Sequence, residues 1–291
     1  MANKLAVRDS VVLITGGARG IGAATAALFA AHGARVWIGD VDADICRRTA
    51  DELGVSGGPL DVTSVASWQQ LLARIEAADG PLDILVNNAG VMPLGAFEDE
   101  TEQVRDLILD VNVRGVLNGM QAVLPGMASR GRGHVVNVAS LAGMIPLPGM
   151  VTYNASKFAA LGASLAARRE YAGTGVVVSA VLPSAVRTEL TSGARLGGGM
   201  PTVDPDDVAA AILAVLKSRA ARRSVPRWVA PAWSTTAFVP ERLQNLARRL
   251  LDDRRALTSL DTAARGAYIE RVNRQALSHH TQHGNVGEPT P

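Results

Sequence analysis

A glycine-rich segment stands between a short apolar run and an alanine-rich stretch near the start of the chain. The segment covers residues 15–22 and reads TGGARGIG, the apolar run covers 11–14, and the alanine-rich stretch continues to His32. Glycine lets a backbone approach an anion closely because it has no Cβ, and the first turn of a helix offers unpaired N–H groups to the same anion. This strand, turn and helix predict a dinucleotide-binding unit with contacts from Gly16, Arg19, Gly20, Ile21 and Gly22.

Short apolar runs and longer helical patterns alternate as far as about residue 230. Candidate strands follow at residues 35–38, 82–86, 134–138 and 176–181, and candidate helices at about 42–53, 64–78, 101–128, 153–172 and 205–219. The runs lack a polar–apolar alternation, which indicates strands buried on both faces, as in a parallel sheet. The chain is therefore predicted to be an α/β protein with a Rossmann-type, doubly wound, mainly parallel sheet and helices on both faces.

Composition argues against several other classes of protein. Of the 291 residues, 47% are hydrophobic and 19% are charged, which suits a large buried core and not a mostly disordered chain. A net charge of +2 and only 4% aromatic residues do not suggest a nucleic-acid partner. Cys46 is the only cysteine, the histidines lack metal-ligand spacing, and no run reaches the roughly 18 apolar residues of a membrane span. We expect a cytoplasmic protein without a metal site.

The character of the chain changes near residue 230. Residues 1–230 are expected to form the dinucleotide-binding and catalytic domain, 231–277 a helical C-terminal extension, and 278–291 a flexible tail. The extension contains Trp233, Phe238 and leucines at helical spacing between arginines. Three interpretations stay open for it: a helix packed on the domain, a lid or subunit contact, and a peripheral membrane contact.

An acidic residue closes the second predicted strand. Asp40 lies 18 residues after Gly22, where a carboxylate can accept hydrogen bonds from the adenosine ribose and repel a 2′-phosphate. Arg19 favours the opposite preference, because a guanidinium can bind a 2′-phosphate. The balance predicts NAD as the cofactor, with NADP as the alternative. Asp61, followed by Val62, ends a third short predicted strand and is expected either to meet the adenine edge or to cap the next helix.

Tyr153 and Lys157 lie four residues apart in a helical stretch, which places both side chains on one face. A phenol has a reference pKa of about 10 and is a poor base at neutral pH. A nearby ammonium group favours the phenolate, so Lys157 is expected to lower the pKa of Tyr153. Ser140 follows the strand at 134–138, at the sheet edge where ligands bind. The three side chains predict an acid–base site.

Two further motifs lie between the glycine-rich segment and Ser140. The first is Asn88-Ala89-Gly90 after a predicted strand, and the second is Asn112. With Ser140 thirteen residues before Tyr153, the whole set resembles the short-chain dehydrogenase/reductase family in order and spacing, over about residues 10–190.

The resemblance implies a role for each matching residue. Tyr153 would exchange a proton with the substrate oxygen, Lys157 would also bind the nicotinamide ribose, and Ser140 would hydrogen-bond the substrate oxygen. Asn112 would hold a water that relays protons. Without the resemblance, it would be interpreted as a buried asparagine whose side chain is hydrogen-bonded by backbone groups. The remaining cofactor contacts implied are Asn88, Ala89, Gly90, Pro183, Val186 and Thr188. Ser184 departs from the family, which often has glycine there, and Thr188 could instead cap a helix.

These features predict an oxidoreductase that moves a hydride between a nicotinamide cofactor and an alcohol or ketone, with a tyrosine as general acid and base. Six apolar residues near the site favour a hydrophobic substrate, although core packing explains them equally well: Leu141, Met144, Ile145, Leu147, Val151 and Leu190. The alternatives are an NADP(H)-dependent 3-oxoacyl thioester reductase of the same family and a non-catalytic dinucleotide-binding module. The resemblance also implies a homodimer or homotetramer.

Overall fold

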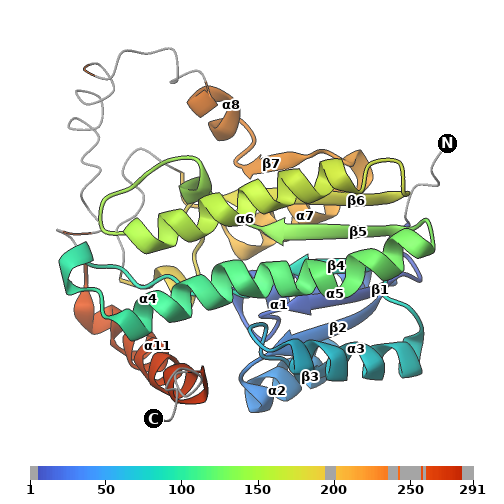
Figure 1. Cartoon of the computed structure of the whole chain (residues 1–291), viewed down its shortest axis with the longest axis horizontal. Helices are drawn as coiled ribbons and strands as arrows, with labels where there is room; N and C mark the ends of the chain where they lie inside the picture. The colour runs from blue at the N-terminus through green and yellow to red at the C-terminus, as the bar shows by residue number, and fades with distance from the viewer. Residues whose placement is uncertain (1–5, 194–200, 235–241, 243–256, 258–259, 284–291) are drawn as a thin grey trace, which may run out of the picture.

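The computed structural model describes residues 6–193, 201–234, 242, 257 and 260–283. Within them, seven parallel strands form one sheet in the order β3-β2-β1-β4-β5-β6-β7 (Figure 1). The strands are β1 Val11–Thr15, β2 Arg35–Asp40, β3 Ser56–Pro59, β4 Ile84–Asn87, β5 Gly133–Val138, β6 Val176–Pro183 and β7 Arg222–Val225. The winding direction reverses between β1 and β4, where an open α/β sheet leaves a crevice at the carboxyl ends of its strands.

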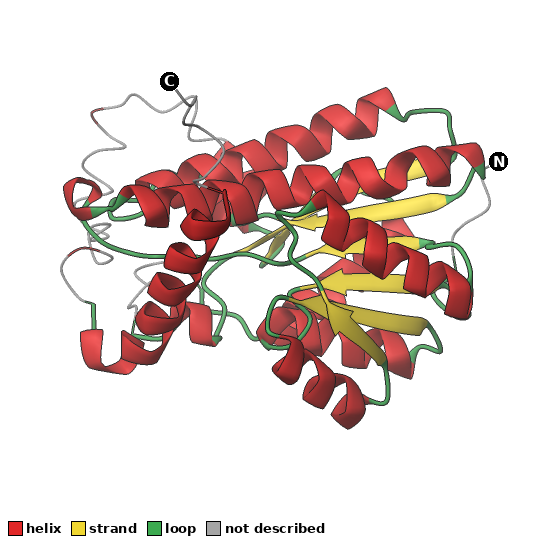
Figure 2. Ribbon diagram, turned by 60° about the horizontal axis from the view of Figure 1, so that its bottom comes forward, coloured by secondary structure: helices red, strands yellow, loops and turns green. Residues whose placement is uncertain are grey.

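Helices cover both faces of this sheet (Figures 1 and 2), which confirms the predicted doubly wound α/β fold. The helices are α1 Gly20–Ala31, α2 Ala43–Leu53, α3 Val65–Asp79, α4 Glu102–Leu109, α5 Gly115–Ser129, α6 Val151–Glu170, α7 Pro205–Ser218, α8 Val229–Ser234 and α11 Thr262–His283. Single turns stand at η1 Phe97–Asp99, η2 Asp110–Arg114, η3 Leu141–Gly143 and η4 Glu189–Thr191.

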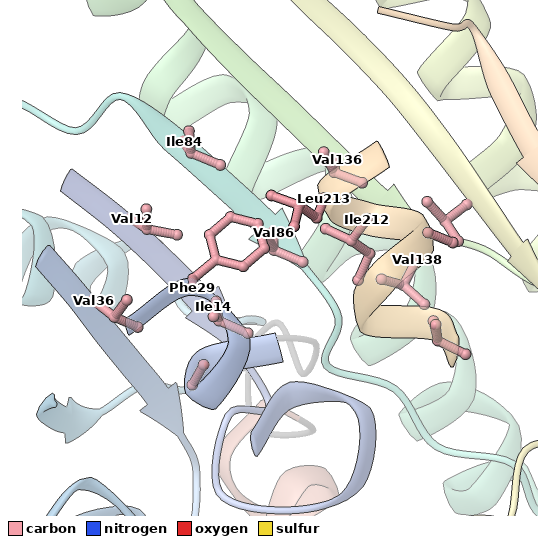
Figure 3. Packing of buried hydrophobic residues seen from close by; sticks show 14 of the residues in the cluster. Val12, Ile14, Phe29, Val36, Ile84, Val86, Val136, Val138, Ile212 and Leu213 are labelled. Carbon is pink, nitrogen blue, oxygen red and sulfur yellow. The ribbon is translucent and has the colours of Figure 1, made fainter. Parts of the chain in front are cut away.

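Alternating strand residues supply two separate cores, because successive side chains of a strand point to opposite faces. Val12 packs with Phe29 of α1 and Ile212 of α7 on one face (Figure 3). Leu13, its neighbour in β1, packs with Trp68 of α3 on the other face. Both cores are fully shielded from water, which is why the strands read as continuous apolar runs in the sequence.

The third strand differs from the prediction, which expected it to end at Asp61. β3 is Ser56–Pro59, and its centre consists of Gly57 and Gly58. A Cβ on Gly57 would lie 2.9 Å from the Cβ of Ala50, and one on Gly58 would lie 2.9 Å from Leu71 Cδ1. The helices on both faces thus leave no room for side chains, so the strand lacks the branched residues by which strands are recognised.

The helix predicted at 101–128 is divided into α4 and α5 by a π-helical turn, η2. Asn112 in this turn is completely buried, and its side chain bonds both backbone groups of Val91: Oδ1 accepts from N at 2.9 Å and Nδ2 donates to O at 2.9 Å. A π-turn inside a helix often marks a functional region. Here it holds the segment after β4 against the helix.

The C-terminal part of the chain contributes α11, which packs on α4 at the side of the molecule to which the strand arrows point (Figure 1). The prediction of a flexible tail from residue 278 is wrong for 278–283, because α11 continues to His283 and buries His279. Phe238 and the leucines at 243–251 lie outside the described residues. Trp233, a residue of α8, packs partly buried against the core. Among the described helices, none is both long and apolar enough to cross a bilayer.

Candidate active site

A cavity of about 390 Å³ lies at the carboxyl ends of the strands. Its lining comes from the turns after β1, β2, β4, β5 and β6, from α6, and from α11. Of the predicted site residues, these line it: Gly16, Arg19, Gly20, Ile21, Asp40, Asp61, Val62, Asn88, Ala89, Gly90, Ser140, Tyr153, Lys157, Pro183, Val186 and Thr188. Segments far apart in the sequence therefore meet in one crevice, as expected for the strand ends of an open parallel sheet.

The glycine-rich turn has a geometry that only glycine accommodates. Gly16 has φ +61°, and a Cβ on it would lie 2.8 Å from the Cα of Ala89. Gly22 does not line the cavity; a Cβ there would lie 2.2 Å from Gly16 O. Gly22 therefore serves the close packing of α1 on the turn, while Gly16 and Gly20 face the cavity.

The N-terminus of α1 is left open. Among the described residues, no side chain caps it, and its first turn carries no acidic residue. The N-caps of α2, α3 and α4 differ, because Asp42, Ser64 and Thr101 each accept a hydrogen bond from a backbone N–H of the first turn. Free amide groups beside Gly20 and Ile21 suit an anionic group such as a diphosphate.

Asp40 is held as an acceptor at the end of β2. Its Oδ2 accepts from Ala18 N at 3.2 Å and its Oδ1 accepts from Asp42 N at 3.1 Å. Burial raises the pKa of Asp40, while these two hydrogen bonds and Arg19 act in the opposite direction. Arg19 is itself occupied, because its Nη2 lies 2.9 Å from Asp42 Oδ2 and its Nε 3.9 Å from Glu189 Oε2.

Asp61 and Asn88 shape the walls between the two ends of the cavity. Asp61 Oδ1 accepts from Thr63 N at 2.9 Å and from Thr63 Oγ1 at 2.7 Å. The cap of α3 is Ser64, so Asp61 does not cap that helix as one interpretation expected. Asn88 Nδ2 donates to Thr15 O at 2.9 Å and to Gly16 O at 3.1 Å, which fixes the glycine-rich turn against the end of β4.

Tyr153, Ser140 and Lys157 meet at the inner end of the cavity. Tyr153 is buried and lines the cavity together with Ser140, whose Oγ accepts from Ala142 N at 3.1 Å. Burial raises the pKa of Tyr153 to about 12, although the Ser140 hydrogen bond acts to lower it. Lys157 Nζ donates to Val138 O at 3.2 Å and lies 5.7 Å from the centre of the Tyr153 ring, and burial lowers the pKa of Lys157 to about 8.

The pKa of Tyr153 is thus displaced opposite to the expectation from the sequence. The four-residue spacing does bring Lys157 to the same face, but its ammonium nitrogen donates to the backbone carbonyl of Val138 and lies 5.7 Å from the centre of the Tyr153 ring. Burial then dominates, because the phenolate loses its hydration. At neutral pH this site holds a protonated phenol, which can donate a proton.

Comparison with known proteins defines the family. A family model described as short chain dehydrogenase matches residues 10–197. The chain belongs to the short-chain dehydrogenase family. Membership makes it an oxidoreductase and, with this fold, implies a nicotinamide dinucleotide as cofactor.

Several other proteins are similar to the chain. The 2,5-dichloro-2,5-cyclohexadiene-1,4-diol dehydrogenase LinX of Sphingobium indicum is 38% identical over 197 residues, which cover 66% of this chain and 78% of LinX. The oxidoreductase UcpA of Salmonella typhimurium is 42% identical over 184 residues, covering 61% and 70%. The crystal structure of gox2181 matches with a TM-score of 0.70 at 26% identity, over 77% of this chain and 98% of that one.

The residues of this short-chain dehydrogenase fit the implied dinucleotide. The open amides of α1 suit its diphosphate, the Asp40 carboxylate suits a ribose, and the turn approaches Ala89 closely at Gly16, which has no side chain. Ser184 does not obstruct the site, because its Oγ donates to Pro201 O at 2.6 Å. Thr188 lines the cavity and begins η4.

Asn112 is the one predicted catalytic residue of this short-chain dehydrogenase that does not line the cavity. Besides its bonds to Val91, its Nδ2 donates to Ser156 Oγ at 3.0 Å, and Ser156 Oγ donates to Tyr153 O at 2.7 Å. These contacts connect the π-turn to the first turns of α6. A role for Asn112 in holding a relay water stays a prediction.

The apolar residues named from the sequence divide into three groups. Leu141, Leu147 and Leu190 line the cavity near Tyr153. Met144 and Ile145 pack in the core instead, and Val151 is half exposed on the outer face of α6. The cavity also gains apolar residues that the sequence did not single out, among them Met92, Leu107 and Met150.

Sequence reasoning missed the wall that α11 contributes. Arg271, Gln275, Ser278 and His279 of this helix line the cavity. Next to them, Tyr268, Val272 and Ala276 recur every fourth residue and pack with α4. This spacing is a signal for a packed helix, but the apolar residues are too few and small for it to stand out in the sequence.

Proposed function

We propose that this short-chain dehydrogenase uses NAD(H) to interconvert a hydrophobic alcohol and the corresponding ketone, with Tyr153 as the general acid and base. The observation that carries the proposal is that buried Tyr153 lines the inner end of the cavity together with Ser140 and Lys157. Few other roles explain a protonated phenol, a serine and a buried ammonium group within one crevice.

The bound dinucleotide supplies the hydride donor or acceptor. In the direction of reduction, the Tyr153 hydroxyl donates its proton to the carbonyl oxygen of the substrate as negative charge develops there. Ser140 hydrogen-bonds the same oxygen and stabilises that charge. In the direction of oxidation Tyr153 must first lose its proton, which positive charge nearby favours; Lys157 provides one such charge.

Three contacts support NAD over NADP. Asp40 offers a carboxylate at the end of β2, where a 2′-phosphate would be repelled. Arg19, the residue that could attract this phosphate, is paired with Asp42 and lies near Glu189. Arg19 thus lies between two carboxylates, which makes its guanidinium less available to a further anion than that of an unpaired arginine. The same pairing speaks against the NADP(H)-dependent thioester reductase.

Substitution of Asp40 tests the cofactor preference. Asp40→Ala is expected to lower kcat/KM with NADH by about tenfold, the cost of losing a charge-assisted hydrogen bond, and to leave kcat/KM with NADPH unchanged or higher. Asp44→Ala, an exposed aspartate of α2 that pairs with Arg47, is the matched control. A wild-type enzyme that already prefers NADPH would contradict the assignment.

The apolar lining near Tyr153 supports a hydrophobic substrate of the ring-alcohol type. Met92, Leu147, Met150 and Leu190 surround the side chain. LinX is by name a dehydrogenase of a chlorinated cyclohexadiene diol, which agrees with such a site. Oxidation of a panel of cyclic and linear secondary alcohols, followed through the absorbance of the reduced nicotinamide, tests this. Turnover restricted to small hydrophilic alcohols would reject the hydrophobic substrate.

An apolar outer surface supports the expected homodimer or homotetramer. Leu117 of α5 and Val151 and Phe158 of α6 are exposed by 44%, 50% and 46%, on two helices that lie side by side (Figures 1 and 2). Neighbouring exposed apolar residues of this kind mark interaction surfaces.

Phe158→Glu is expected to separate the oligomer at this surface, which for a dimer leaves single chains of 30.3 kDa and for a tetramer leaves smaller assemblies, because the carboxylate would be buried unpaired in the interface. Light scattering after size-exclusion chromatography measures the mass. Val65→Glu, at a residue 57% exposed on α3, should leave the oligomer intact. A wild-type protein that is monomeric at all concentrations, or a variant with unchanged mass, would rule out this interface.

A further inference from the structure

Arg271 of α11 carries a positive charge to the cavity wall beside the glycine-rich turn. Its Nη1 donates to Glu189 Oε2 at 2.6 Å, and its side chain is 27% exposed. Glu189 also lies 3.9 Å from Arg19, the N-cap residue of α1. One carboxylate thus stands between two guanidinium groups next to the open N-terminus of α1.

The position of Arg271 is well determined by its own helix. The Tyr268 ring lies 5.2 Å from the Arg271 guanidinium, and the Tyr268 hydroxyl accepts from Met92 N at 2.7 Å. One turn earlier, the fully buried Arg265 donates through Nη1 to Leu190 O at 3.0 Å and to Ser192 O at 2.9 Å. These bonds join α11 to the segment that follows β6, so Arg271 does not move freely.

Arg271 faces η4, which contacts the start of α1. Glu189 directly follows Thr188, and a Cβ on Gly20 would lie 3.1 Å from Thr188 Cγ2. The segment that holds Glu189 is therefore in contact with the first residue of α1, where the open amides are. Arg19 is committed to Asp42, whereas Arg271 has Glu189 as its acidic contact in the part of the chain that the structure describes.

We propose that Arg271 is a cofactor-binding residue that exchanges Glu189 for the diphosphate of the bound dinucleotide. The inference rests on the proposed function and adds a contact from the C-terminal helix to it. A guanidinium forms paired, charge-assisted hydrogen bonds with phosphate oxygens, so the exchange replaces a half-exposed ion pair by a stronger one. Glu189 then acts as a competitor that must be displaced.

A purely structural role for the pair makes the opposite prediction for Glu189. If the Arg271–Glu189 bond only holds α11 in place, Arg271→Met and Glu189→Gln should weaken cofactor binding alike. If Arg271 binds the diphosphate, Arg271→Met weakens binding and Glu189→Gln strengthens it, because the competing carboxylate is gone. The gain in cofactor affinity from Glu189→Gln should be smaller in the double variant with Arg271→Met, because that protein has no guanidinium at position 271 to bind the diphosphate.

Calorimetric titration of the full chain with ADP-ribose and with adenosine separates these cases. We expect Arg271→Met to raise the dissociation constant for ADP-ribose by about tenfold and to leave that for adenosine unchanged, since adenosine has no phosphate. Arg274→Met, an exposed arginine one turn further on the same helix, should change neither. Melting temperatures identify any variant that fails to fold, and Glu189→Gln then still distinguishes the two roles.

Each result bears on one claim. ADP-ribose affinity that is equal in Arg271→Met and Arg274→Met overturns the contact while leaving the proposed function intact. Weaker ADP-ribose binding by Glu189→Gln overturns it in favour of the structural role. A wild-type chain that binds neither ADP-ribose nor NADH overturns the proposed function together with this inference.

Discussion

Tyr153→Phe is expected to lower kcat by about 10³-fold while leaving the dissociation constant for NADH nearly unchanged. The substitution removes the hydroxyl that donates the proton and keeps the buried ring. Because the loss falls on an interaction made in the transition state, kcat and kcat/KM should fall together. Steady-state kinetics and a fluorescence titration with NADH measure the two quantities separately.

Tyr171→Phe provides the matched control for this prediction. Tyr171 ends α6, the same helix that carries Tyr153, and packs partly buried on the core rather than in the cavity. Its variant should turn over at the wild-type rate. A Tyr153→Phe enzyme that keeps the wild-type kcat would show that another group moves the proton.

Lys157→Met is expected to stabilise the fold and impair the reaction. The pKa of Lys157 falls from 10.5 to about 8 because the charge is buried, which costs roughly 3 kcal/mol of folding free energy at neutral pH. The hydrogen bond from Lys157 to Val138 O offsets about 1 kcal/mol of this cost. The apolar variant should therefore gain about 2 kcal/mol in the free energy of unfolding and lose most of its activity, as expected for a strained functional site.

The pH dependence of stability gives a second reading of Lys157. Its folded-state pKa lies below its unfolded value, so the cost is complete below pH 8 and disappears as the pH rises from about 8 towards 10.5. The stability advantage of Lys157→Met, measured by denaturant unfolding, should shrink across this window. A variant that is less stable than wild type at pH 7 would mean that the ammonium group is favourable where it lies.

Most of the fold, and most of the residues that line the candidate site, could be predicted from the sequence. Strand runs such as β5 are readable because both faces are buried, and the turn at Gly16 is readable because only glycine fits there. The spacing of Tyr153 and Lys157 correctly placed both on one face of α6. The sequence could not show whether burial, which raises the pKa of Tyr153, outweighs the nearby charge of Lys157, which was expected to lower it.

The remaining differences arise from contacts between distant segments. The segment 56–59 is a strand because it pairs with β2, and its centre is glycine because Ala50 and Leu71 leave no room for side chains; neither contact is visible within the segment itself. Arg271 reaches the cavity because Arg265 and Tyr268 fix α11 against the segment after β4 and the one after β6. The local sequence of α11 does not indicate these contacts, so the contribution of α11 to the cavity wall is known only from the tertiary structure.

Deuterium transfer tests the central claim most directly. Reduced nicotinamide carrying deuterium at C4 is incubated with a ring ketone that the wild-type enzyme accepts, and the product is examined by mass spectrometry. We predict deuterium at the carbinol carbon with wild-type protein and almost none with Tyr153→Phe, although both bind the reduced cofactor equally. Equal labelling by the two proteins, or wild-type protein that binds the cofactor and labels no alcohol or ketone in a broad panel, would contradict the account.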